Sequence, residues 1–191
     1  MDIPGRESPE VVGSKEIYRG RIVELVLDTV REGDLTYTRE VVRHPGGAGI
    51  VAVFDDRTVA LVRQYRHPTM RYVLEIPAGK LEEGERPEES AARELEEELG
   101  VVAARMEPLS EFFTTPGFCA EKLWVFLATG LTETAQHLES DELIEIVRVP
   151  FARALEMVRS REIEDAKSII GLLLAAQRLG IPTGDVAEKS V

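Results

Sequence analysis

The segment 79–101 combines an amphipathic helix with a crowd of carboxylates, and this combination constrains the chain more than any other feature. Apolar residues recur at helical spacing over 87–99, which predicts a helix with one buried face. Pro87 suits its first position and Gly100 its C-terminal end. Four glutamates crowd its last turns: Glu94, Glu96, Glu97 and Glu98. Like charges one turn apart destabilise a helix by about 0.2–0.5 kcal/mol per pair, so something must offset this repulsion.

Two partners could relieve the crowding. Arg93 lies four residues before Glu97, so it can pair with that carboxylate and orient it. Glu94 and Glu98 are one turn apart on the same face, which suits an oxygen-loving cation such as Mg²⁺. The alternative is that this helix presents an ordinary acidic face to solvent.

The spacing of the segment is more specific than its charge. Gly79 is followed by five residues and Glu85, and seven further residues lead to the run Arg93 to Val101, whose sequence is Arg-Glu-Leu-Glu-Glu-Glu-Leu-Gly-Val. These residues match the Nudix box at every specified position, so the chain resembles the Nudix hydrolases. The resemblance implies an α/β fold, an α/β/α sandwich around a mixed sheet, with the box forming a loop–helix–loop. It also implies cleavage of the pyrophosphate of a nucleoside diphosphate linked to another group.

The same resemblance implies a divalent metal, Mg²⁺ or Mn²⁺, as cofactor. Pyrophosphate cleavage needs neutralised phosphate charge and a water of lowered pKa, and a bound metal ion supplies both. By analogy with the family, five residues would hold the metal: the Ala78 carbonyl, Glu94, Glu97, Glu98 and Glu142.

Three further features resemble the ADP-ribose pyrophosphatase branch of the family. Pro116 lies sixteen residues beyond Gly100, Arg66 lies shortly before the box, and a strand-rich N-terminal stretch contains Arg39. The substrate-binding residues implied are Arg39, Arg66, Pro116, Gly117 and Phe118. Each has an alternative: a Pro-Gly turn, a surface arginine, or extra strands of a monomer. Cys119-Ala120 departs from the Ser/Thr-Asp that often follows in the branch.

The branch also implies a catalytic carboxylate on a segment late in the chain. Alignment on Ile144-Glu145 favours Glu142 as the base, with Glu139 and Asp141 as alternatives. Glu97 and Arg93 complete the predicted catalytic set.

Residues 1–15 are polar and predict a loose arm. Beyond them, β-prone stretches alternate with few helices: strands are expected at 21–27, 37–42, 50–54, 59–65, 73–76, 109–114, 121–128 and 143–149, and closing helices at 151–160 and 166–179.

We expect two parts, an N-terminal arm and β-region (1–45) and a Nudix hydrolase domain (46–191). The resemblance implies that the first part forms a homodimer.

Composition limits the partners. A net charge of −12 leaves no basic excess for nucleic acid or an anionic membrane. The single cysteine, Cys119, permits no intrachain disulfide and favours the cytoplasm. The resemblance to the ADP-ribose pyrophosphatase branch implies hydrolysis of ADP-ribose to AMP and ribose 5-phosphate. The alternatives are hydrolysis of another sugar nucleotide such as GDP-mannose, and a catalytically silent regulator that binds ADP-ribose.

Overall fold

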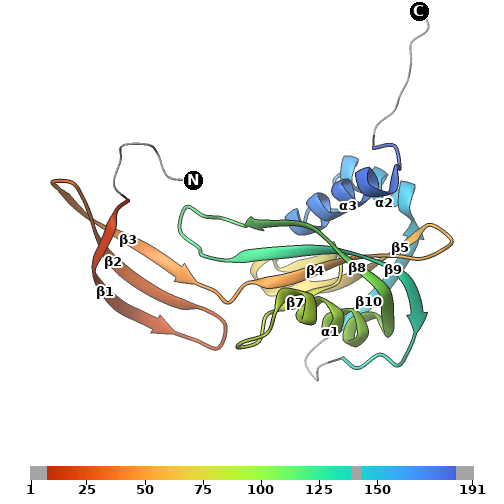
Figure 1. Ribbon diagram of the computed structural model, residues 1–191, viewed down its shortest axis with the longest axis horizontal. Coiled ribbons are helices and arrows are strands. Elements are labelled where there is room, and N and C mark those ends of the chain that lie inside the picture. The colour runs from red at the N-terminus through yellow and green to blue at the C-terminus, as the bar shows by residue number, and fades with distance from the viewer. Residues whose placement is uncertain (1–7, 139–142, 184–191) are drawn as a thin grey trace, which may run out of the picture. The chain divides into compact units, whose positions relative to one another are not determined.

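The computed structural model describes residues 8–138 and 143–183. The chain divides into two compact units, each described below by itself (Figure 1). The first comprises residues up to Gly46 together with Phe113–Lys122, and the second comprises Gly47–Phe112 and the residues from Leu123 onward.

The first unit contains a three-stranded antiparallel sheet. Its strands are β1 (Glu10–Arg19), β2 (Glu24–Glu32) and β3 (Leu35–Arg43), in that order. Gly33 adopts a φ of 59° in the tight turn between β2 and β3, a conformation that glycine tolerates best.

The expectation of a loose arm over residues 1–15 is wrong from Glu10 onward, because β1 begins there. All ten residues of this strand are exposed. Its sequence, EVVGSKEIYR, also lacks the regular alternation of apolar and polar residues by which a strand is recognised. The ladder to β2, in which Lys15 pairs with Leu27, holds the strand instead.

The second unit is built on a mixed sheet. Its strands run in the order β10-β5-β4-β9-β8, with β6 paired to β5 and β7 paired to β4. The pairing of β4 with β9 is parallel, whereas β4 pairs antiparallel with β5 and β7. The strand bounds are β4 (Gly47–Val53), β5 (Thr58–Arg66), β6 (Arg71–Glu75), β7 (Ala78–Lys80), β8 (Val101–Phe113), β9 (Lys122–Glu133) and β10 (Ile144–Pro150).

Helices cover both faces of this sheet. The helix α1 (Pro87–Leu99) lies on one face, and α2 (Phe151–Arg159) and α3 (Ala166–Leu179) lie on the other (Figure 1). A short 3₁₀ turn (His67–Thr69) links β5 to β6. This arrangement confirms the expected α/β/α sandwich around a mixed sheet. In the part of the chain that is described, no helix has the length and apolar character needed to span a membrane.

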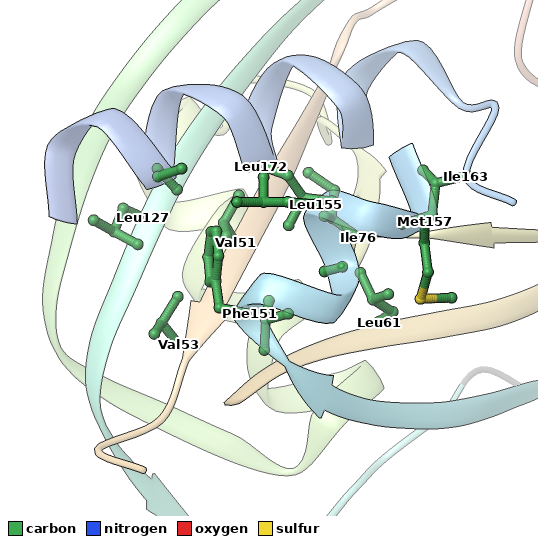
Figure 2. Packing of buried hydrophobic residues seen from close by; sticks show 14 of the residues in the cluster. Val51, Val53, Leu61, Ile76, Leu127, Phe151, Leu155, Met157, Ile163 and Leu172 are labelled. Carbon is green, nitrogen blue, oxygen red and sulfur yellow. The ribbon is translucent and has the colours of Figure 1, made fainter. Parts of the chain in front are cut away.

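The central strand β4 is buried along its whole length and serves both cores. Ile50 packs in the cluster that includes Leu95 of α1. Its neighbour Val51 faces the opposite layer, where Phe151 and Leu172 fill the space beneath α2 and α3 (Figure 2). The alternation of a strand thus ties the two helical layers to one backbone.

The sheet opens where the box begins. β4 and β5 pair only at Ala52–Ala60 and Val53–Val59; beyond this point β6 pairs with β5, and β7 pairs with β4. The Ile50 amide also donates to the Pro77 carbonyl at 2.9 Å. The chain that leads into α1 therefore starts from the centre of the sheet, which fixes its position.

Candidate active site

The helix α1 is oriented by its apolar face, as the sequence predicts. Ala91, Leu95 and Leu99 are buried in the core beneath it. Gly100 ends the helix with a φ of 62°, and its amide donates to the Glu96 carbonyl. Because Glu94 and Glu98 follow the buried residues by three positions, they lie along the edge of that face and are only 6% and 1% exposed.

The backbone of β7 lies directly against these carboxylates. A Cβ atom on Gly79 would lie 1.8 Å from Oε1 of Glu94, so a side chain at this position would displace that carboxylate. The Ala78 amide donates to Oε2 of Glu98 at 3.1 Å. A Cβ on Gly47 would in turn lie 2.7 Å from the Gly79 carbonyl oxygen. Gly47 is the first residue of β4, and its lack of a side chain permits this close approach.

Arg93 joins the carboxylates of the box. Its Nε donates to Glu85 at 2.9 Å, and its Nη1 donates to Glu94 at 2.8 Å and to Glu97 at 2.9 Å. The predicted pairing of Arg93 with Glu97 is therefore present. The hydrogen bond to Glu85, followed by the charge of Glu94, raises the pKa of Arg93. The hydrogen bond from Arg93 likewise lowers the pKa of Glu85, so both groups stay charged.

The donors at this place fit a hard divalent cation. Two buried carboxylates, those of Glu94 and Glu98, lie beside the Ala78–Lys80 backbone, with Glu97 at their edge, and all offer oxygen. Within residues 8–138 and 143–183, no three aspartate, glutamate, histidine or cysteine side chains form a complete metal-binding cluster. Glu142, the further ligand expected from the sequence, lies outside the described residues, as do Glu139 and Asp141.

Four of the predicted substrate residues, Arg39, Pro116, Gly117 and Phe118, lie in the first unit. Arg39 is exposed on β3, with its guanidinium 4.1 Å from the centre of the Tyr37 ring. Pro116, Gly117 and Phe118 form an exposed turn, in which the Cys119 amide donates to the Thr115 carbonyl. Two backbone hydrogen bonds tie this turn to β3. The Val42 amide donates to the Phe118 carbonyl, and the Ala120 amide donates to the Val42 carbonyl, both at 2.8 Å. The strand that carries Arg39 is therefore hydrogen-bonded to the turn.

Arg66 has a partner that the sequence analysis missed. Its Nε and Nη2 donate to the two carboxylate oxygens of Glu75 at 2.7 and 2.8 Å, and Glu75 is buried. Lys167 of α3 contacts the same carboxylate. One signal was available, a glutamate between the apolar Leu74 and Ile76, because a buried charge requires a partner. The identity of that partner depends on the tertiary structure.

With this geometry established, comparison with known families gives a definite result. The NUDIX domain matches residues 43–170, which is more than half of the chain. The chain therefore belongs to the Nudix family.

Individual relatives span nearly the whole chain. A Bacillus subtilis (strain 168) protein named "ADP-ribose pyrophosphatase" is 40% identical over 162 residues, covering 83% of this chain and 88% of the relative. A Bacillus methanolicus protein named "Methanol dehydrogenase activator" is 38% identical over 166 residues, covering 85% and 90%. A solved structure of an "ADP compounds hydrolase" is similar in fold, with a TM-score of 0.81 at 22% identity, covering 95% of this chain and all of that one (100%).

We predict that Glu98→Gln lowers turnover of a nucleoside diphosphate compound by about two orders of magnitude or more, because a ligand for the cation is lost. The glutamine oxygen can still accept from the Ala78 amide, so thermal unfolding should change little. Glu88→Gln, an exposed position in the first turn of the same helix, serves as the control. Steady-state kinetics at saturating Mg²⁺ measure the effect, and near wild-type turnover in Glu98→Gln would contradict the metal assignment.

Proposed function

We propose that this protein is a cytoplasmic ADP-ribose pyrophosphatase that hydrolyses ADP-ribose to AMP and ribose 5-phosphate. The observation that carries the proposal is a complete Nudix box, folded so that Glu94 is buried against Gly79 and Glu98 against the Ala78 amide. The B. subtilis relative supports the choice of substrate. Pro116, at the spacing typical of the ADP-ribose branch, supports it independently.

Nudix hydrolases generally depend on a divalent metal, and in this chain Mg²⁺ or Mn²⁺ is the proposed cofactor. Its ligands would be Glu94, Glu97, Glu98 and the Ala78 carbonyl, joined by Glu142. When bound, such an ion neutralises charge on the diphosphate and lowers the pKa of the attacking water. Arg93 acts on its neighbours, holding Glu94 and Glu97 in place through its Nη1.

Other residues of the chain bind the substrate in this proposal. The Arg66 guanidinium contacts the diphosphate, a task that suits its planar array of donors. Arg39, Pro116, Gly117 and Phe118 contact the rest of the ADP-ribose molecule. Arg39 and Arg66 supply positive charge locally in a chain whose net charge is −12.

A substrate panel tests the proposal. Purified protein with Mg²⁺ is incubated with ADP-ribose, GDP-mannose, other nucleoside diphosphate sugars and dinucleotides, and the products are separated by chromatography. We expect the highest kcat/KM for ADP-ribose, with AMP and ribose 5-phosphate in equal amounts. A higher kcat/KM for GDP-mannose would contradict ADP-ribose as the substrate and make GDP-mannose the preferred one. Tight binding of ADP-ribose without cleavage would instead indicate a regulator, a role that the name of the B. methanolicus relative also raises.

For the catalytic base, we predict that Glu142→Gln lowers kcat about 100-fold or more while KM stays within about threefold, because a base acts in the transition state. Glu139→Gln, on the same acidic segment, is the matched control and should have a smaller effect. A crippled Glu139→Gln beside a nearly silent Glu142→Gln would transfer the role to Glu139. If both variants are active, Glu97 becomes the best candidate.

We further propose a homodimer formed through the N-terminal β-region. Large apolar side chains are exposed there: Val11, Val12, Ile17, Tyr18, Ile22 and Leu35. Such exposure within one small region is typical of an interface. Deletion of residues 1–45 should abolish both dimer and activity, and Ile17→Lys should weaken the dimer while Lys15→Ala should not. Sedimentation velocity measures the assembly, and an active full-length monomer would contradict this proposal.

A further inference from the structure

Arg66 is held in the second unit by two buried charged groups from separate parts of the chain. Glu75 comes from the end of β6, and Lys167 comes from the first turn of α3. Both are at least nine-tenths buried, with exposures of 2% and 8%. The Arg66 side chain, in contrast, is 38% exposed. The array therefore leads from the interior of the molecule to an accessible guanidinium.

The geometry leaves part of Arg66 available to a ligand. Glu75 takes Nε and Nη2 in a two-pronged contact, one oxygen for each nitrogen. Within the described residues, Glu75 is the hydrogen-bond partner of this guanidinium, and Nη1 is the nitrogen that the contact does not use. A diphosphate oxygen can therefore bind Nη1 without breaking the contact. A long side chain fixed before binding also loses less conformational entropy when the ligand arrives.

Lys167 fixes the orientation of the Glu75 carboxylate. Its Nζ contacts Oε2 of Glu75 and lies 3.0 Å from Oδ2 of Asp165, the N-cap residue of α3. The next residue, Ser168, accepts a hydrogen bond from the Ile76 amide through its Oγ at 2.7 Å. The first turn of α3 thus grips both the side chain of Glu75 and the backbone that follows it.

The charges of the array stabilise one another. Burial raises the pKa of Glu75, but the hydrogen bonds from Arg66 and the charge of Lys167 outweigh burial and hold the pKa below its ordinary value. The pKa of Arg66 is raised mainly by its hydrogen bond to Glu75, and the charge of the box residue Glu98 adds to this.

Stability alone is a weak reason for such an array. Taking charges out of water is costly, and buried ion pairs are often replaced by apolar residues without loss of stability. We infer that Lys167 is a positioning residue of the substrate site: acting through Glu75, it fixes the Arg66 guanidinium in the orientation that binds the diphosphate. The inference rests on the proposed function, in which Arg66 contacts that group.

A double-mutant cycle tests the inference. Lys167→Met keeps the length of the side chain and removes its charge; we expect KM for ADP-ribose to rise about tenfold with kcat within about threefold, the pattern of lost binding. Arg66→Ala should raise KM at least as much. In the Arg66→Ala background, Lys167→Met should add less than about twofold, because the two residues act as one unit. Arg178→Met, an exposed position on the same helix, should leave KM unchanged.

Two results would overturn the inference: an unchanged KM in Lys167→Met, or the same rise of KM with and without Arg66. If Lys167→Met does not fold, Lys167→Gln replaces it in the cycle. Its amide can still donate to Glu75, so we expect a smaller rise, about threefold, that also disappears without Arg66.

A measurement without substrate separates this inference from the proposed function. In protein labelled with ¹⁵N-arginine, the Nε–H signal of Arg66, assigned from Arg66→Lys, should exchange slowly with solvent. It should exchange at least about tenfold faster in Lys167→Met, because the hydrogen bond to Glu75 opens more often. Unchanged exchange would refute the positioning role. If the wild-type protein does not hydrolyse ADP-ribose, the proposed function fails while this measurement still decides the role of Lys167.

Discussion

The hydrogen bonds of Arg93 make the acidic helix α1 compatible with a stable fold. Three carboxylates, on Glu85, Glu94 and Glu97, converge on this one guanidinium. Without a cation between them, like charges on neighbouring turns would oppose the helix and the loop before it. The Nη2 of Arg93 also donates to the Lys80 carbonyl at 3.3 Å, so this one side chain joins the helix, the loop and β7. The rest of the candidate site is built on this junction.

Close backbone packing supplies the second constraint. Gly47 lets the β7 backbone approach β4, and Gly79 leaves space beside β7 for the carboxylate of Glu94 from α1. The opening of the sheet between β4 and β5 makes room for this contact at the centre of the second unit. Carboxylates that would be solvated on an isolated helix become buried beside backbone atoms. This burial distinguishes the candidate cation site from an ordinary acidic surface.

Among the described residues of this unit, buried charge occurs in two places, and the two differ in character. The box glutamates offer oxygens suited to a divalent cation, whereas Glu75 is already engaged by two cationic side chains, those of Arg66 and Lys167. A catalytic site needs both kinds of group, ligands for an ion and preorganised donors for an anionic substrate. The apolar layers on either side of β4 hold both on rigid elements.

The sequence by itself determined the sandwich, the bounds of α1 and the pairing of Arg93 with Glu97, because each depends on local spacing or on a box with fixed positions. The sequence prediction failed where the local pattern carries no clear signal. It missed the exposed strand β1, and it placed the start of β8 at 109 whereas the strand begins at Val101. β8 is an edge strand, and its mixture of polar and apolar residues obscures its first half. Only the tertiary structure decided that Lys167 meets Glu75. These residues are 92 positions apart, and no spacing rule connects a helix to a strand across the sheet.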